Sequence, residues 1–203
     1  MNPNIYKMFP VEVIEYQETG KTYDHIINLL RKETFKEHNA FSSVRDLHED
    51  CAFAEPFAFI NQCLEDVRSR YGYDCEKFEV SSSWSNFSEP QSNMGHKFHR
   101  HSMSYLSGVF YFTEGAPIGF EDPMTPRVMN QIEVLRTDGY EPFHYIAPKP
   151  GKLIIFPSWL YHWTKPHTED FERWNISFNV LPTGKINFNM ATDSTAILEI
   201  KKS

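Results

Sequence analysis

The chain has 203 residues, a formal net charge of −7 and a composition that is 40% hydrophobic and 23% charged. These values are typical of a folded globular protein, and the length suits a single domain. The negative charge argues against general nucleic-acid binding, which needs a basic face to neutralise phosphates. The sequence contains no apolar run long enough to span a membrane and no signal-peptide pattern, so we expect a soluble, cytoplasmic protein without a membrane partner.

The first third of the chain predicts one strand and two helices. Residues 11–16 (VEVIEY) have the composition of a strand. Apolar residues from Tyr23 to Phe35 recur at helical spacing, and the mostly polar residues 36–50 predict a loop. The clearest helix follows, because apolar residues from Phe53 to Tyr71 recur at steps of three and four, and Gly72 marks its end.

After Asp74 the period of the pattern changes from helical to alternating, as in residues 78–86. Further strand-like runs are found at 106–113, 132–136, 143–147, 152–156, 174–181 and 196–200. Glycine- and proline-containing turns, such as Asp138-Gly139, separate them. This pattern predicts a mainly β fold, an antiparallel barrel or sandwich, with the N-terminal helices packed on the outside. We expect one domain over 1–203, in which 1–76 form a helical support and 77–203 form the β core that carries the site.

Histidines are concentrated just before the strand-like run at 106–113. His99 and His101 are two positions apart, so in an extended backbone both side chains point to the same side. His162, in an aromatic run about sixty residues later, is the best candidate for a third metal ligand. Three protein ligands on one face of an iron ion leave positions for a cosubstrate and dioxygen. Arg173, on a later strand, could bind a carboxylate through two charge-assisted hydrogen bonds.

Four segments follow one another in the sequence: the histidine pair with Ser107-Gly108-Val109-Phe110-Tyr111, Phe120-Glu121-Asp122-Pro123, the run from Pro148 to His162, and the strand from Arg173 to Asn179. In this order they resemble the iron(II)/2-oxoglutarate-dependent oxygenases of double-stranded β-helix (jelly-roll, cupin-like) fold. The sequence looks most similar to bacterial and phage members that have no assigned substrate. The resemblance covers roughly residues 84–180.

The resemblance implies an oxidoreductase, a dioxygenase that uses Fe(II), 2-oxoglutarate and O2. It would couple the oxidative decarboxylation of 2-oxoglutarate to succinate with hydroxylation of an unidentified substrate. His99 and His162 would be iron ligands, and Arg173 would bind the distal carboxylate of 2-oxoglutarate.

The third ligand is where this sequence departs from the family. His101 stands where most of these oxygenases have Asp or Glu, and a neutral imidazole there removes a negative charge from the metal site. We interpret His101 as the third metal ligand. The alternative is that Asp122 or Glu121 reaches the metal and His101 is a bystander.

Further residues are candidates for contacts at the site, and core packing is the alternative for each. Asn175 and Ser177 would face the same side of their strand as Arg173 and, with Tyr111 and Tyr105, could contact 2-oxoglutarate. Trp84, Asn86 and His96 are candidates for positions around the metal ligands.

Two other functions fit part of the pattern. One is a cupin-type metalloenzyme without 2-oxoglutarate, although the usual cupin acid is absent from 102–108 and Arg173 has no role in it. The other is a non-catalytic jelly-roll protein, for example a binding or virion-associated module with a vestigial metal site. The sequence does not identify the primary substrate, and it leaves a homodimer open.

Overall fold

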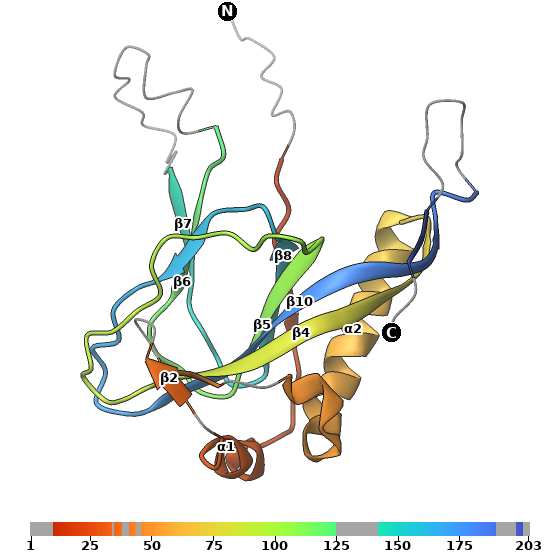
Figure 1. Cartoon of the computed structure of the whole chain (residues 1–203). Helices are drawn as coiled ribbons and strands as arrows, with labels where there is room; N and C mark the ends of the chain where they lie inside the picture. Colours follow the sequence, from red (N-terminus) through yellow and green to blue (C-terminus); the bar gives the residue numbers. More distant parts are fainter. Residues whose placement is uncertain are drawn as a thin grey trace, which may run out of the picture.

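The fold is built on two antiparallel β-sheets that face each other, with helices on the outer side of the larger sheet (Figure 1). The computed structural model describes residues 10–33, 35–37, 41–43, 46–124, 142–189 and 198–200. The strands are β1 (Ile14–Gln17), β2 (Phe35–Glu37), β3 (Phe41–Ser43), β4 (Cys75–Ser88), β5 (Leu106–Tyr111), β6 (Ile118–Glu121), β7 (Phe143–Ile146), β8 (Lys152–Pro157), β9 (His162–Thr164), β10 (Arg173–Ile186) and β11 (Leu198–Ile200). The helices are α1 (Asp24–Leu30), α2 (Ala54–Tyr71) and the short 3-10 helices η1 (Leu47–Glu49) and η2 (Cys51–Phe53).

The larger sheet has the strand order β1-β8-β5-β10-β4-β3-β2, and β11 pairs with β10. The smaller sheet has the order β7-β6-β9. The two long strands β4 and β10 lie side by side for most of their length, with Arg173 opposite Ser88 and Thr183 opposite Lys77. Two facing antiparallel sheets form a jelly-roll architecture, as the sequence predicts.

The central strands of the larger sheet separate an apolar core from a polar interior. On β10, the even-numbered residues from Trp174 to Val180 are buried in the apolar core beneath the helices. The odd-numbered residues Arg173, Asn175 and Ser177 face the space between the two sheets. The period of two in the sequence therefore separates core residues from residues that line the candidate site.

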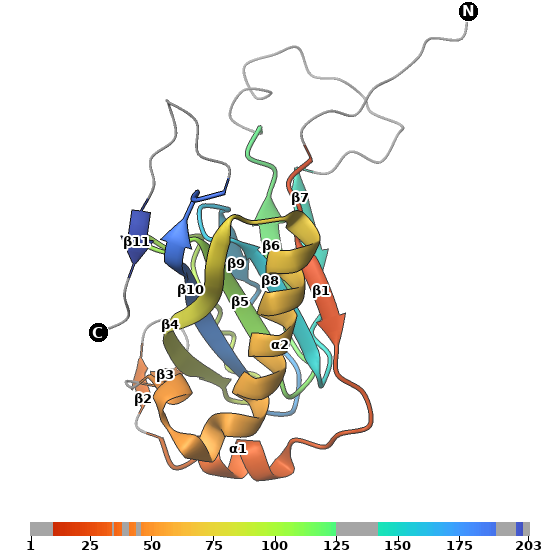
Figure 2. The same ribbon diagram turned by 90° about the vertical axis from the view of Figure 1, so that its right-hand side faces the viewer.

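The helices cover the larger sheet on the face away from the smaller sheet, and α2 lies along that face (Figure 2). The apolar stripe of α2 buries Ile60, Leu64 and Val67 almost completely, and each such burial contributes roughly 1.5–3 kcal/mol. Gly72 ends the helix in the left-handed conformation, with φ of 64°. The predicted packing of the N-terminal helices on the outside of the sheet is confirmed.

The main differences from the predicted elements lie before and within the β core. The first helix ends at Leu30, and Phe35 belongs to β2, because the segment returns to pair as a strand. The predicted loop 36–50 contains strand residues of β2 and β3, held by the pairing of Phe41 and Ser42 with β4, and also η1. β6 and β9 were not expected as strands from the sequence, because three or four residues give little alternation.

Some predicted elements lie outside the described residues, namely the strand at 132–136 and the turn at Asp138-Gly139. Of the strand predicted at 196–200, residues 198–200 are described as β11. Within the described parts of the chain, no helix is both long enough and apolar enough to cross a membrane.

Candidate metal centre

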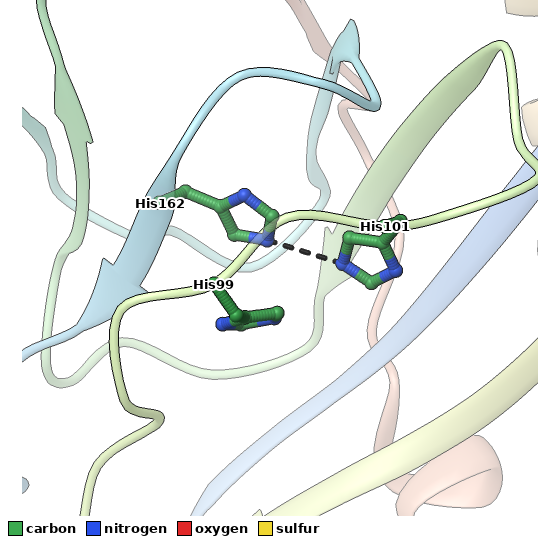
Figure 3. Close-up of side chains that lie close together, drawn as sticks. All are labelled: His99, His101 and His162. Carbon is green, nitrogen blue, oxygen red and sulfur yellow. Dashed lines mark hydrogen bonds between the residues drawn. The ribbon is translucent and has the colours of Figure 1, made fainter.

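Three histidine side chains meet at one end of the space between the sheets (Figure 3). His99 and His162 pair through two backbone hydrogen bonds of 2.9 Å, and the amide of His101 donates to the carbonyl of Ser158 at 3.0 Å. The histidine pair therefore lies beside β9 as an extended segment, although it is outside the named strands. One potential ligand atom from each ring lies within 4.8 Å of the others, and Nε2 of His101 is 3.1 Å from Nε2 of His162.

Backbone carbonyls fix the orientation of two of these rings. Nδ1 of His99 is 2.6 Å from the carbonyl oxygen of Lys97, and Nδ1 of His162 is 2.9 Å from that of Leu160. A carbonyl only accepts, so each Nδ1 carries the proton and each Nε2 carries a lone pair. This arrangement is the usual one for histidines that bind a metal through Nε2. The third ring, that of His101, stacks on Trp84 with ring centroids 5.7 Å apart.

Burial keeps the imidazoles of His101 and His162 neutral at physiological pH. Mainly through loss of hydration, and partly through the neighbouring His99, the pKa of His162 is lowered to about 3 and that of His101 to about 4. Neutral imidazole is the form that binds metal ions, and a set of nitrogen donors suits iron among other transition metals.

The spacing of the rings also fits one metal ion. With bonds of about 2.1 Å to nitrogen, adjacent ligands of an octahedral ion lie roughly 3 Å apart. The separation of 3.1 Å between the Nε2 atoms of His101 and His162 matches that value. The three residues therefore fit the metal that their sequence pattern suggests.

A cavity of about 110 Å³ extends from the histidines into the space between the sheets. Arg173 lies in its wall with only 2% of its surface exposed, and its guanidinium carbon is 5.4 Å from the centre of the Tyr111 ring. Three buried polar atoms around this cavity have no hydrogen-bond partner among the described residues: Nε of Arg173, the hydroxyl of Tyr111 and Nδ2 of Asn175. Each is a donor, so this part of the cavity is complementary to an anion.

Burial also lowers the pKa of the Arg173 guanidinium and raises that of the Tyr111 phenol. In both cases loss of hydration is the main cause, because each charged form is deprived of water. An arginine nevertheless stays charged in a protein, so the cavity contains a desolvated positive charge.

A hydrogen-bond network holds the polar wall of the cavity in place. Nδ2 of Asn86 donates to Oδ1 of Asn175 and to the hydroxyl of Ser177, both at 2.9 Å. The hydroxyl of Ser42 donates to Oδ1 of Asn86 at 2.9 Å. The contact between the two asparagines follows from strand register, since Asn86 and Asn175 lie directly opposite each other on β4 and β10. Asn175 is thereby oriented with its own amide nitrogen free for a ligand.

The structure brings most of the candidate residues to this cavity. Its wall includes the three histidines and the candidates Trp84, Asn86, His96, Tyr111, Arg173, Asn175 and Ser177. Tyr105 lies elsewhere, stacked on Phe78 with 45% of its surface exposed, because the alternation of β5 begins only after it.

The two acidic alternatives for the third ligand are in other places. Asp122 accepts a hydrogen bond from the amide of Met124 at 2.8 Å and lines a separate cavity with Val13 and Leu160. Glu121 lines a groove on the outside of the smaller sheet. The group of potential metal ligands found among the described residues contains the three histidines and neither carboxylate.

Several cavity residues were not singled out from the sequence: Ser42, Ser107, Gly108, Val109, Ile118, Phe156 and Thr164. Ser107 and Val109 could have been found, because they alternate in phase with Tyr111 on β5. Ser42 gave no such signal, since its place depends on the pairing of β3 with β4.

Comparison with known proteins agrees with this geometry. Residues 82–179 match the family model described as "Putative 2OG-Fe(II) oxygenase". No match was found among curated proteins.

The fold is similar to several solved structures at low sequence identity. HygX from Streptomyces hygroscopicus with nickel and 2-oxoglutarate bound is 10% identical, with 85% of this chain and 84% of that chain covered and a TM-score of 0.60. EctD from S. alaskensis with 2-oxoglutarate and 5-hydroxyectoine is 13% identical, with coverages of 85% and 73% and a TM-score of 0.62. A prolyl-4-hydroxylase from Pseudomonas putida is 14% identical, with coverages of 86% and 94% and a TM-score of 0.59.

The structure therefore has the double-stranded β-helix fold with flanking helices, and this prediction is confirmed. The match over residues 82–179 agrees with the family that the sequence resembles, the iron(II)/2-oxoglutarate-dependent oxygenases.

Proposed function

We propose that this protein is an Fe(II)- and 2-oxoglutarate-dependent dioxygenase that hydroxylates a substrate. The observation that carries the proposal is the burial of Arg173, which is 2% exposed and whose Nε has no hydrogen-bond partner among the described residues. An isolated buried charge is strongly unfavourable unless it is paired. An anion that enters the cavity would supply the missing partner.

The chemistry of the wall selects the kind of anion. The planar guanidinium of Arg173 can donate two parallel hydrogen bonds to a carboxylate. The unpartnered Tyr111 hydroxyl and Asn175 amide lie at the same cavity and can donate to the same anion. A 2-oxo dicarboxylate has one carboxylate for these donors and, at its other end, an oxo acid that can chelate a metal ion.

His99, His101 and His162 would hold Fe(II) at the mouth of this cavity. Three neutral imidazoles leave both positive charges of the ion uncompensated, unlike a set that includes a carboxylate. Together with the Arg173 guanidinium, this charge favours a dianionic cosubstrate. A bound iron ion would supply the oxidative chemistry, with O2 as the oxidant and succinate and carbon dioxide as the products from 2-oxoglutarate.

The residues of the chain would bind and orient the cosubstrate and would exclude water from the site. Trp84 packs against His101, and the Asn86–Asn175 hydrogen bond orients the Asn175 amide. Burial between the two sheets limits access of water to the reacting groups. We further propose that residues 1–76 support the β core of residues 77–203 as part of one domain. A cupin-type enzyme without 2-oxoglutarate would leave the buried charge of Arg173 without a partner.

Calorimetric titration of 2-oxoglutarate into protein loaded with Ni(II) tests the proposal without turnover. Arg173→Met should weaken 2-oxoglutarate binding by about 10- to 100-fold, as expected for charge-assisted hydrogen bonds, and leave the nickel affinity unchanged. Arg173→Lys should have a 2-oxoglutarate affinity between those of the wild type and Arg173→Met, because lysine keeps the charge and loses the planar guanidinium. Arg70→Met, at an exposed ion pair on α2, is the matched control. Unchanged 2-oxoglutarate affinity in Arg173→Met would contradict the proposal.

A further inference from the structure

A second, larger cavity adjoins the candidate site. This outer groove has a volume of about 830 Å³ and is bordered by residues 93–98 on one side and by the smaller sheet on the other. It shares two wall residues, His96 and Thr164, with the inner cavity that contains the three histidines. The amide of Thr164 donates to the carbonyl of His96 at 3.2 Å, so these two residues are hydrogen-bonded to each other where the two cavities meet. A molecule that extends to the His96 end of the outer groove would therefore lie beside the candidate metal centre, since the ring centroids of His96 and His99 are 6.4 Å apart.

The lining of the groove includes three aromatic side chains. Phe98 is 46% exposed and Phe143 is 39% exposed, and each ring centre is 5.3 Å from that of Trp163. The backbone makes room for this cluster at Gly119, where a Cβ atom would come within 2.6 Å of the Trp163 ring. Exposed aromatic rings in a concave site favour binding of an apolar group.

The groove also contains one cation and one anion, Lys97 and Glu121. Neither forms an ion pair with another described residue, whereas two other cations nearby already contact rings. The Lys165 ammonium lies 3.8 Å from the centre of the Tyr145 ring, and the guanidinium of Arg100 lies 5.4 Å from that of Tyr161. The charges left for a ligand are therefore of both signs, within one apolar groove.

We propose that the outer groove binds the primary substrate, and that this substrate is a zwitterion with an apolar side chain, either an amino acid or a short peptide with free ends. Its carboxylate would pair with Lys97, its ammonium with Glu121, and its apolar part would pack on Phe98, Phe143 and Trp163. The inference rests on the proposed function, because it assigns the substrate class of that same site. A volume of about 830 Å³ lies in the range of pockets for small molecules rather than of extended protein interfaces.

Equilibrium binding of defined probes to the protein loaded with Ni(II) and 2-oxoglutarate tests the inference. The probes are L-phenylalanine, the tripeptide Gly-Phe-Gly with free ends, and the same tripeptide acetylated and amidated. Saturable binding of either zwitterionic probe, with weaker binding of the blocked tripeptide, is expected. Preference for L-phenylalanine would identify a free amino acid as the source of the zwitterion, and preference for the tripeptide would identify a peptide.

Variants of the groove sharpen the test. Lys97→Met and Glu121→Gln should each weaken binding of the zwitterionic probe about three- to tenfold and leave binding of the blocked tripeptide unchanged. Trp163→Leu should weaken all probes that bind, and Lys149→Met, at an exposed position outside the groove, should change none. Equal binding of free and blocked tripeptide, or no saturable binding of any probe, would overturn the inference.

The two proposals fail in different ways. The groove residues Lys97, Phe98, Glu121, Phe143 and Trp163 are not among the candidate metal ligands, so probe binding should persist in metal-free protein. Probe binding without 2-oxoglutarate binding would overturn the proposed function and leave the groove assignment in place. Binding of 2-oxoglutarate without probe binding would overturn the groove assignment alone.

Discussion

Nε2 of His101 lies 3.1 Å from Nε2 of His162, although the two residues are 61 positions apart in the chain. Nδ1–H of His162 donates to the carbonyl of Leu160, so Nε2 of His162 can only accept. Two nitrogen atoms at this separation need a proton or a cation between them. Because His99 presents its own Nε2 lone pair to the same place, a shared metal ion is the arrangement that satisfies all three rings.

Removal of His101 distinguishes a ligand from a bystander. Loss of a residue that only surrounds a metal ligand typically costs about 10- to 100-fold in affinity, so His101→Ala should weaken Fe(II) binding more than about 100-fold. His96→Ala should have a smaller effect, because His96 is outside the cluster of three. Anaerobic competition with a metal chelator measures the Fe(II) affinity of both variants. Asp122→Asn is the control, and a larger loss of affinity in that variant than in His101→Ala would favour the carboxylate as the third ligand.

The Asn86–Asn175 hydrogen bond should matter for 2-oxoglutarate and not for iron. Asn86→Ala removes the donor to Oδ1 of Asn175 and leaves buried polar groups without partners. We expect a loss of about 1–3 kcal/mol in the free energy of unfolding and a loss of about tenfold in 2-oxoglutarate affinity. Urea denaturation and calorimetry give the two values. If 2-oxoglutarate affinity stays at the wild-type value while stability falls, Asn86 has only a structural role.

A cluster of three hydroxyls, two of them buried, supports the segment that carries the histidines. The hydroxyl of Ser158 is 2.8 Å from that of Ser107 and donates to that of Ser104 at 2.9 Å, and the Ser158 carbonyl accepts the amide of His101. Ser158→Ala should lower the free energy of unfolding by about 1–3 kcal/mol, because its partners lose a buried hydrogen bond. Ser102→Ala, at an exposed position, is the control in urea denaturation. Equal stability of the two variants would mean that the hydroxyl cluster contributes little.

Stability at acidic pH should depend on a bond between β1 and α2. The hydroxyl of Tyr16 donates to Asp66 at 2.6 Å, and this bond is the main reason that the pKa of Asp66 is lower in the folded protein. A lowered carboxyl pKa adds stability above the unfolded pKa of about 3.9, and this contribution is lost as pH falls through the folded pKa. Tyr16→Phe should therefore be less stable than wild type at pH 7, and the difference should shrink below about pH 4.

Urea denaturation at a series of pH values measures this difference. Because Arg70 also lowers the pKa of Asp66, a double-mutant cycle with Asp66→Asn isolates the contribution of the tyrosine. A stability difference that does not change between pH 7 and pH 3 would show that the tyrosine hydroxyl does not act through the charge of Asp66.

The sequence predicts those parts of the structure that depend on local periodicity. The alternation in residues 78–86 and 174–181 is strong enough to identify β4 and β10, and it places Arg173, Asn175 and Ser177 on one face. The apolar stripe of α2 is equally clear. The spacing of His99 and His101 also predicts that both face one side, and the structure has them so.

Other features depend on tertiary pairing and leave no local signal. β2, β3 and β9 have three residues each, and their neighbours hold them in place. The burial of Arg173 is likewise unexpected, because arginine is usually exposed and only the closing of the two sheets covers this one. The separation of Glu121 from the inner cavity follows from strand alternation on β6, where Phe120 faces His162.

The most direct test of the account is an anaerobic titration with Fe(II) and then 2-oxoglutarate, followed by visible absorption. Chelation of iron by the 2-oxo acid should produce a metal-to-ligand charge-transfer band, which His162→Ala should abolish and which Arg173→Met should shift to higher 2-oxoglutarate concentrations. Iron binding without a band would contradict the role of 2-oxoglutarate and favour a cupin-type site. Absence of iron binding would contradict the metal centre itself.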